Sequence, residues 1–508
     1  MKLELANWRQ KAKHYGVAVA IAHQFLVEDP VGFTAKAAEK FRQSNRPLLS
    51  VLANTTKSVL QRYSYSPMDE FLDQGELSKA VMWAEQQRRL SRREASLRDS
   101  TNDKLKRLDH IFATGCKINR TGVVVHYLTN SLPYTNSGYT LRSQKVLQAQ
   151  QDAGIATFAI TRIGYPLVIG NVPSANQDEI DGITYRRALP KHFPISITRR
   201  DAKAVTELVK YCREVGAQAI HTTTDYSNAI VASEAAAQLK IPWVYEVRGE
   251  LESTWASRRG HDAVNSEFYK KARQAETNAM LAASHVVVLS EIYKKEAISR
   301  GVSSERITVI PNAIELGAIQ QKPSTNSIRK KRHELGISEE NKVVAAITSI
   351  VEYEGLETLI KAIKLLPDKF IAVVVGDGID RPRLEKLSEE LGSRVRFVGK
   401  QPQNEIDIWY AIADVFVIPR LDLPVTRKVT PIKGLQAQAY GIPIVASDLP
   451  ALREVTGNIE TYVAPGDASA LAEAIKQQPS QVNETGIQWA YTRTWEQNSK
   501  RYQQIYED

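Results

Sequence analysis

Short apolar runs typical of buried strands alternate with helix-length segments along most of this chain, beginning near residue 121. The run over 122–128 is followed by a loop, a helical segment over 140–153 and a second apolar run over 155–161. Strand, helix and strand in such close succession form the pattern of a parallel βαβ unit. The sequence therefore predicts α/β domains with parallel sheets.

The alternation occurs as two series. The first series continues with strands at 219–221, 242–249, 285–290 and 307–315, and with helices at 227–238, 264–283 and 291–300. The second series has strands at 343–348, 370–378, 394–399, 415–418 and 444–446, and helices at 355–366 and 381–391. The polar stretch between them, 316–340, indicates a link between two domains.

Length and composition agree with more than one domain. The 508 residues, of which 43% are hydrophobic, suffice for two to three cores. We predict a helical extension, two α/β domains and a closing helix, with bounds 1–117, 118–318, 319–484 and 485–508.

The N-terminal extension is the most basic part of the chain. Residues 1–117 hold 20 Lys/Arg and 13 Asp/Glu, and helical spacing is clear at Thr34–Arg42 and Glu76–Asp99. Such a surface can meet anionic lipid or a protein partner, and it can equally be an ordinary solvated face. Nucleic-acid binding is disfavoured, because aromatic residues do not interleave with the charges.

Several features predict a cytoplasmic protein, and the basic extension allows a peripheral position at the inner face of a membrane. No run approaches the ~20 apolar residues that a membrane-crossing helix needs, and no signal peptide is evident. Cys116 and Cys212 fit neither a disulfide framework nor a metal-binding spacing.

The stretch 409–449 carries the strongest candidate site. We expect a helix with Thr430 as N-cap and Pro431 as first residue, with Lys433 in its first turn and Gly441 at its end. A helix N-terminus offers unpaired N–H groups and partial positive charge, both of which suit a diphosphate. A cation in the first turn opposes the helix dipole, and a bound anion would resolve that conflict.

The loop that precedes this helix adds three cations, Arg420, Arg427 and Lys428. Together with the helix start they predict a site for a phosphorylated ligand. The alternative is a solvated basic loop over an ordinary strand–helix unit.

Glycine-containing turns supply further candidates. Ser137 and Gly138 directly precede the first helix, where a glycine lets backbone approach a ligand. The turn Gly376-Asp377-Gly378 follows a strand and leaves room for a base or ribose. Either turn can also be a plain tight turn without a ligand.

Polar residues also end two strands of the first series. His221, with Asp225 four residues further on, could serve as an acid–base or orienting group. Arg248 could hold an anionic group, and Glu250 could orient hydroxyls. Strand ends are where open α/β sheets bind ligands. A hydrogen-bonded histidine and a loop-shaping ion pair are the alternative readings.

Taken together, these segments resemble glycosyltransferase family 4, the retaining enzymes of GT-B fold. The resemblance covers roughly residues 120–508 in the family's order and lies at 126–154, 241–257, 272–291, 309–315, 352–363, 373–378, 394–400 and 414–455. It implies two Rossmann-like domains facing across a cleft, with the last helix crossing back to the first domain. The helical extension lies outside the resemblance.

The resemblance also implies roles for the candidate residues. The donor would be a nucleotide sugar, UDP- or GDP-linked, and the acceptor a glycan or lipid-linked glycan; no metal or other cofactor is implied. The donor diphosphate would contact Arg420, Arg427, Thr430, Lys433, Ser137 and Gly138. The nucleotide would contact Gln436, Gly376, Asp377, Gly378 and Gly399. The catalytic group would be His221, Arg248 and Glu250.

The chain departs from the family's pattern at several positions. The two glutamates of the family's E-x7-E motif correspond to Lys428 and Gln436, and the second histidine of its His-x-His motif corresponds to Thr223. Thr348-Ser349 and Glu354 stand where the family often has Gly-Arg and Lys. These departures keep two other hypotheses open, a non-catalytic GT-B partner of a transferase complex and a GT-B sugar-nucleotide epimerase.

Overall fold

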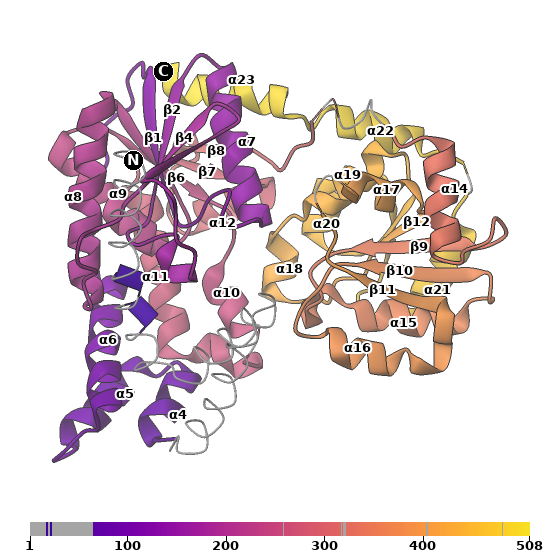
Figure 1. Ribbon diagram of the computed structural model, residues 1–508, viewed down its shortest axis with the longest axis horizontal. Helices are drawn as coiled ribbons and strands as arrows, with labels where there is room; N and C mark the ends of the chain where they lie inside the picture. The colour runs from indigo at the N-terminus through magenta and orange to yellow at the C-terminus, as the bar shows by residue number, and fades with distance from the viewer. Residues whose placement is uncertain are drawn as a thin grey trace, which may run out of the picture. The chain divides into compact units, whose positions relative to one another are not determined.

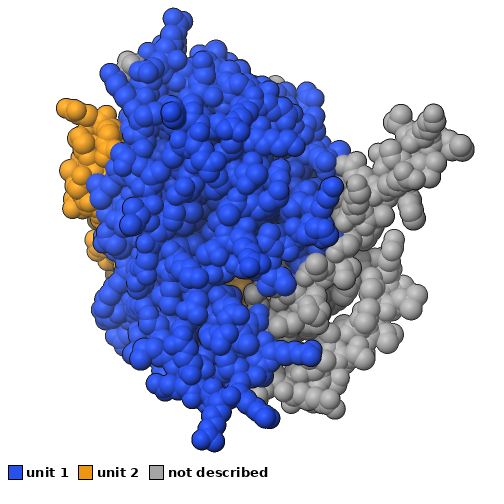
Figure 2. All heavy atoms as spheres, turned by 90° about the vertical axis from the view of Figure 1, so that its left-hand side faces the viewer, with its two compact units in different colours: residues 1–247, 251–286, 503–508 blue, residues 248–250, 287–502 orange. Residues whose placement is uncertain are grey.

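Figure 1 shows the computed structural model, which describes residues 17, 18, 21, 22, 65–257, 259–315, 317, 322–402, 405–479 and 481–507. The chain divides into two compact units, coloured in Figure 2. Unit 1 comprises residues 1–247, 251–286 and 503–508, and unit 2 comprises residues 248–250 and 287–502. The helix expected over Thr34–Arg42 lies outside the described residues.

The first sheet has eight strands in the order β3-β4-β2-β1-β5-β6-β7-β8. β1 pairs in parallel with β2 and β5, β2 with β4, and β5 with β6, whereas β3 and β4 form an antiparallel hairpin. The boundary between the units falls within β7. The strands are β1 (Val123–Leu128), β2 (Ala156–Thr161), β3 (Gln177–Ile180), β4 (Ile183–Arg187), β5 (Ala219–Thr223), β6 (Trp243–Val247), β7 (His285–Val288) and β8 (Ile307–Val309).

Helices of unit 1 cover both faces of its sheet, with α8 and α9 on one side and α7 on the other (Figure 1). Leu128 and Ala159, from neighbouring strands, pack against Leu147 of α7 in a buried cluster. The helices of unit 1 and its boundary are α7 (Gly138–Asp152), α8 (Ile197–Val215), α9 (Tyr226–Leu239), α10 (Leu251–Ala256), α11 (Glu267–Ala282) and α12 (Glu291–Ser299), of which α12 belongs to unit 2.

The described part of the N-terminal extension belongs to unit 1 and packs against α8 and α11 of that unit. It forms α4 (Pro67–Gln74), α5 (Leu77–Gln86) and α6 (Arg92–Leu108). Leu77 and Leu108 lie in one buried cluster with Ala272 of α11. The Asp103 carboxylate accepts from the backbone N–H of Ile197 at 2.8 Å and thus caps the start of α8.

The segment expected to be helical over Glu76–Asp99 is two helices rather than one. Ser91 begins the second helix: its backbone N–H donates to the Glu94 carboxylate at 2.8 Å, and its hydroxyl accepts from the Glu94 N–H at 3.2 Å. This reciprocal capping box sets a new helix start.

Among the described residues, no helix has the length and apolar character that crossing a bilayer requires.

The sheet of unit 2 has six parallel strands in the order β11-β10-β9-β12-β13-β14. They are β9 (Lys342–Ile347), β10 (Phe370–Val375), β11 (Val395–Gly399), β12 (Val415–Ile418), β13 (Ile444–Ser447) and β14 (Thr461–Val463). Both faces of this sheet are buried. Along β9, Val344 lies in one core cluster and Val343 in the other, because successive strand side chains point to opposite faces.

Helices join the strands of unit 2, and some of them were not resolved by the sequence pattern. Those that the structure describes after the first sheet are α14 (Thr325–Glu334), α15 (Leu356–Leu365), α16 (Arg381–Leu387), α17 (Ile406–Ala411), α18 (Pro424–Lys428), α19 (Ile432–Ala439), α20 (Pro450–Val455), α21 (Ala468–Gln477), α22 (Glu484–Tyr491) and α23 (Trp495–Glu507), whose last residues belong to unit 1.

Three sequence-based expectations were wrong in detail. The expected basic loop contains the short helix α18, which Pro424 begins. The following helix starts one residue later than expected, with Pro431 as its N-cap. The C-terminal segment is interrupted between α22 and α23, because the Ile314 N–H donates to the Arg493 carbonyl at 2.9 Å. That tertiary contact draws the backbone out of the helical ladder.

Candidate functional site

Three neighbouring parallel strands of unit 2, β10, β9 and β12, end at one edge of the sheet. Thr348 directly follows β9, Gly376 directly follows β10, and Arg420 lies two residues beyond β12. Ligands of open α/β sheets bind at such carboxyl ends. Two of the predicted residues, Gly376 and Arg420, therefore lie at the edge where such folds bind ligands.

Lys433, in the first turn of α19, reaches back to the end of β9. Its Nζ donates to the Thr348 hydroxyl at 2.6 Å. The side chain is partly accessible as a whole, but its ammonium group is enclosed by protein, and this burial lowers the pKa of Lys433 to about 8. The nearby Glu354 carboxylate opposes the shift and Arg420 adds to it. An anion bound here would stabilise the charged ammonium.

This shift predicts a pH dependence of anion binding. Because a bound diphosphate would raise the lowered pKa of Lys433, binding must take up a proton above pH 8. We expect affinity for a nucleoside diphosphate to be constant below pH 7 and to weaken by up to about tenfold per pH unit above 8. Calorimetry in two buffers of different ionisation enthalpy checks this, and an affinity that is unchanged from pH 7 to 9.5 contradicts it.

Arg420 is buried beside Lys433 and is paired with a carboxylate. Its Nη2 lies 2.6 Å from Glu354 Oε1 and its Nε 3.2 Å from Oε2, while Nη1 donates to the Val429 carbonyl at 2.9 Å. Burial by itself raises the pKa of Glu354, but the Arg420 and Lys433 charges outweigh it and leave that pKa below its ordinary value. Arg420 therefore holds the loop before α18 in place.

Thr430 lies just before α19 in a buried position. Its carbonyl accepts from the Asn312 side-chain amide at 2.9 Å, whereas its hydroxyl oxygen is buried and has no hydrogen-bond partner within the part of the chain that the structure describes. A buried hydroxyl without a partner is costly. A ligand oxygen at this position would satisfy it.

The Gly376–Gly378 turn needs its glycines for close packing. A Cβ at Gly376, whose φ is +139°, would lie 1.8 Å from the Thr348 carbonyl oxygen, and one at Gly378 would lie 2.1 Å from that of Ile350. The turn thus packs against the segment that follows β9, which includes Thr348, the hydrogen-bond partner of Lys433. The predicted nucleotide turn and the predicted phosphate lysine share Thr348 as a neighbour.

Gln436 lies one turn further along α19 and is half-buried. Its Oε1 accepts from the Tyr410 hydroxyl at 2.8 Å, which fixes the orientation of the amide and leaves the NH2 group as donor. Gly399 ends β11 with φ +75°. The roles of Gln436, Asp377 and Gly399 toward a nucleotide stay predictions.

Arg427 and Lys428, adjacent in α18, have different partners. Arg427 is exposed and binds Asp422, with Nε–Oδ1 and Nη2–Oδ2 distances of 2.5 and 2.6 Å. Lys428 lies 2.9 Å from the buried Glu250 and 3.3 Å from Glu296. Neither has a contact with Lys433 among those the structure records, so their part in diphosphate binding stays a prediction.

Glu250 is the centre of a buried ion network. Its Oε1 lies 2.8 Å from Arg300 Nη2 as well as 2.9 Å from Lys428 Nζ, and Arg300 also binds Glu296 at 2.8 Å. Lys428, at the position of a family glutamate, is thus compensated by two carboxylates. Sequence reasoning missed Glu296 and Arg300, since no local signal ties them to this loop. Arg248, two residues earlier, is half-buried.

His221 is fully buried in unit 1 in the middle of β5 (Ala219–Thr223), not at a strand end as the sequence predicted, because the strand continues through Thr223. Its Nδ1 lies 2.7 Å from the Tyr506 hydroxyl, its Nε2 lies 3.2 Å from Glu246, and its ring stacks on His126 at a centroid distance of 4.4 Å. These contacts give His221 a structural role in holding the end of α23. Its catalytic role stays a prediction.

Ser137 and Gly138 start α7, which begins at Gly138 and so two residues before the start that the sequence predicted. Ser137 is the N-cap, and its N–H donates to the Thr140 hydroxyl at 2.9 Å. A Cβ at Gly138 would meet no atom within 4 Å. Protein packing therefore leaves the position open, and a ligand could approach it.

Replacing Gly138 with alanine separates a ligand-approach role from a packing role. Because the added methyl meets no protein atom and alanine favours helices, we expect Gly138→Ala to leave the melting temperature unchanged or slightly raised. If donor phosphates approach this backbone, turnover should fall about tenfold or more. Thermal unfolding and donor turnover measured on one preparation check both, and unaltered turnover would remove Gly138 from the site.

Among the residues that the structure describes, no group of three or more His, Cys, Asp or Glu side chains is arranged to hold a metal ion.

Two family models match the chain. The model described as glycosyl transferase 4-like domain matches residues 137–313, and that described as glycosyl transferases group 1 matches residues 327–481. Similar solved structures include HepE of Anabaena in complex with UDP (18% identity, TM-score 0.58, 75% of this chain and 98% of that one) and sucrose-phosphate synthase of Thermosynechococcus elongatus (21%, 0.60, 75% and 98%). These likenesses establish the GT-B fold. The chain belongs to the group 1, family 4 glycosyltransferases.

Curated relatives match shorter parts of this chain than the solved structures do. D-inositol 3-phosphate glycosyltransferase of Corynebacterium glutamicum is 25% identical over 40% of this chain and 52% of its own length. The lipopolysaccharide core biosynthesis glycosyltransferase LpsE of Rhizobium meliloti is 34% identical over 27% and 38%. The chain spans about half the length of the first curated relatives that it matches.

Proposed function

We propose that the chain is a retaining glycosyltransferase that moves a sugar from a UDP- or GDP-linked donor to an acceptor in cell-surface polysaccharide or glycolipid assembly. The observation that carries the proposal is the enclosed Lys433 ammonium, which has a neutral hydroxyl as its hydrogen-bond partner at the ligand-binding edge of the unit 2 sheet. The relative LpsE, named for lipopolysaccharide core biosynthesis, supports the acceptor class.

The proposed chemistry needs charge stabilisation at the leaving diphosphate. As the bond between sugar and phosphate breaks, negative charge grows on the phosphate oxygens, and preorganised donors aimed at it give a large catalytic effect. Lys433, the Thr430 hydroxyl and the first N–H groups of α19 would supply these donors without a metal ion. The acceptor hydroxyl would attack the same face of the sugar that the phosphate leaves and pass its proton to the departing phosphate.

Other residues keep the roles that the resemblance implies. Gln436 and the Gly376–Gly378 turn would contact the nucleotide, and Ser137 and Gly138 of unit 1 would contribute to phosphate binding. His221 and Arg248 would contact the transferred sugar or the acceptor. Glu250, held between Arg300 and Lys428, would act mainly by positioning the loop that carries Arg248.

Nucleotide binding tests the proposal. UDP, GDP, ADP and CMP are titrated into the full-length protein by calorimetry, with circular dichroism to confirm the fold. We expect one uridine or guanosine diphosphate to bind, since the UDP-bound relative HepE shares the fold. Binding by none of the four to a folded protein would contradict the enzyme proposal.

A second candidate is a non-catalytic partner that keeps the fold within a transferase complex. The replacement of the two E-x7-E glutamates by Lys428 and Gln436, and of a histidine by Thr223, favours it. In the structure the side chains at these positions contact other protein groups. Lys428 pairs with Glu250, Gln436 accepts from Tyr410, and Thr223 contacts the Tyr139 hydroxyl. Nucleotide binding without donor turnover would favour this candidate.

A further inference from the structure

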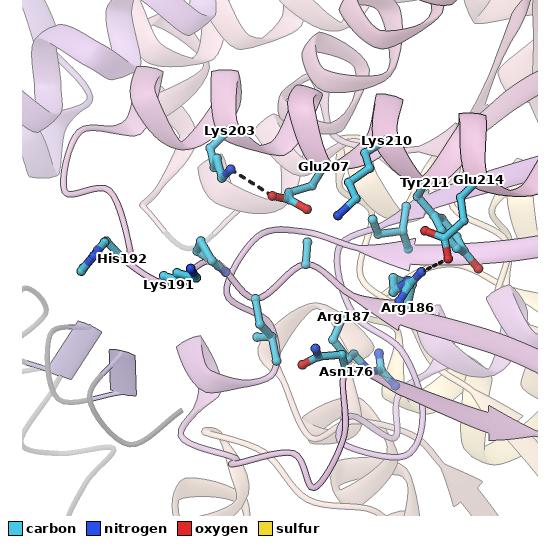
Figure 3. A pocket seen from close by; sticks show the side chains of 14 residues that line it. Asn176, Arg186, Arg187, Lys191, His192, Lys203, Glu207, Lys210, Tyr211 and Glu214 are labelled. Carbon is cyan, nitrogen blue, oxygen red and sulfur yellow. Dashed lines mark hydrogen bonds and ion pairs between the residues drawn. The ribbon is translucent and has the colours of Figure 1, made fainter. Parts of the chain in front are cut away.

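A basic cavity in unit 1 lies apart from every residue assigned a role above. Figure 3 shows it between α8 and the segment that follows β4. Its volume is about 570 Å³, within the range of pockets that hold small ligands. We call it the α8 cavity. Its charged lining residues are Arg186, Arg187, Lys191, Lys203, Glu207, Lys210 and Glu214.

Three of the five cations in this lining are already neutralised. Arg186 is ion-paired with Glu214, and Lys203 Nζ lies 3.0 Å from Glu207 on the next turn of α8. The Arg187 side chain is fully buried and binds Asp178 at 2.7 Å. These three ion pairs form part of the cavity wall, and each pair is electrically neutral.

Lys191 and Lys210 are the exceptions. Within the described residues, neither has a hydrogen bond or an ion pair, and both are exposed at the cavity. Figure 3 shows Lys210 extending from α8 toward the strands, with Lys191 on the segment that follows β4. Two uncompensated ammonium groups in a concave site attract an anion more strongly than they would on a flat surface.

The cavity also lies at a place where the fold binds ligands. Ile160 and Arg187, near the carboxyl ends of the parallel strands β2 and β4, form part of its lining. The wall is further completed by Tyr211, whose ring is covered by the Arg186 guanidinium at 5.1 Å from its centroid. A ring held by an ion-paired arginine is a rigid wall for a sugar-sized ligand.

We propose that the α8 cavity is a subsite for an anionic group of the acceptor, a phosphate or a carboxylate on a sugar, bound by Lys191 and Lys210. The assignment to the acceptor rests on the proposed function, whereas binding of the anion does not. The acceptor is therefore an acidic glycan, and the donor site and this subsite take separate ligands.

The test is binding of glucose 6-phosphate and of glucuronate, with glucose as the neutral reference, to the full-length protein by calorimetry. We expect one anionic sugar to bind, glucose not to bind, and the Lys191→Gln/Lys210→Gln variant to lose about tenfold or more in affinity. Lys386→Gln removes an exposed charge from α16 of unit 2 and should change nothing. Which anionic sugar binds distinguishes phosphate from carboxylate.

Two further arms separate this proposal from the proposed function. Lys433→Ala should leave anionic-sugar binding intact, and the double glutamine variant should leave nucleotide binding intact. Anionic sugars that bind the double variant as well as the wild type, or that do not bind at all, overturn the subsite. If the wild-type protein binds no nucleotide but does bind an anionic sugar, the donor site alone is overturned.

Discussion

Lys433→Ala is expected to reduce donor turnover by about 10²–10³-fold, the usual effect of removing one preorganised donor from a developing oxyanion. The physical reason is that its enclosed ammonium donates to the neutral Thr348 hydroxyl. The nearby Glu354 carboxylate is paired with Arg420, so the ligand would add the counter-charge that the site lacks. Nucleoside diphosphate affinity should fall in parallel. Turnover of the donor identified by the nucleotide titrations measures the effect.

The fold should survive this change. Burial lowers the pKa of Lys433, which means that the protein interior disfavours its charge, so alanine removes an unfavourable desolvation. We expect an unchanged or higher melting temperature. Lys386→Ala, which removes an exposed charge from the same unit, serves as control and should keep full turnover. A Lys433→Ala variant that retains wild-type turnover would remove the central residue of the proposed site.

Arg420→Met is expected to lower the free energy of unfolding by about 3–5 kcal/mol, because it leaves the buried Glu354 carboxylate without its bidentate partner. The nearby Lys433 charge should keep the loss toward the lower end of that range. Urea denaturation measures it. The double variant Arg420→Met/Glu354→Leu should recover most of the stability, since a buried ion pair is often replaced by apolar residues at little cost.

The double variant also tests what Arg420 contributes to the ligand. Sequence reasoning placed Arg420 among the diphosphate contacts, whereas the structure engages its guanidinium with Glu354 and the Val429 carbonyl. If Arg420 acts by shaping the loop, the stable double variant should bind nucleotide within a few-fold of the wild type. A loss as large as that of Lys433→Ala would instead show direct contact with the ligand.

Much of the fold follows from local patterns. Strand-type runs such as 415–418, where the expected and observed strands coincide, are apolar enough to be buried whichever neighbours they have. The β3–β4 hairpin was missed because its strands are short and partly polar, although Asp181-Gly182 at its turn, both at positive φ, is a recognisable hairpin signal. Helix ends shifted where tertiary contacts competed, as at Arg493.

The candidate site was predictable in part for the same reason. A lysine in the first turn of a helix after a strand is visible in sequence, and so is a Gly-Asp-Gly turn. Their meeting at Thr348 follows from parallel strands ending at one edge. The carboxylates that pair with Arg427 and Lys428 could not be predicted from the sequence, since an ion pair depends on the positions of two side chains in the folded protein.

The sequence by itself determined the α/β class, the two series of strands and the edge at which a ligand would bind, because strand burial and helix periodicity are local properties. Only the tertiary structure decided which charges are compensated. Glu250 meets Lys428 across 178 residues of sequence, and His221 meets Tyr506 across 285. Packing alone brings such groups together, and that is why the Thr348 partner of Lys433 and the two α8 cavity lysines, Lys191 and Lys210, emerge only from the tertiary structure.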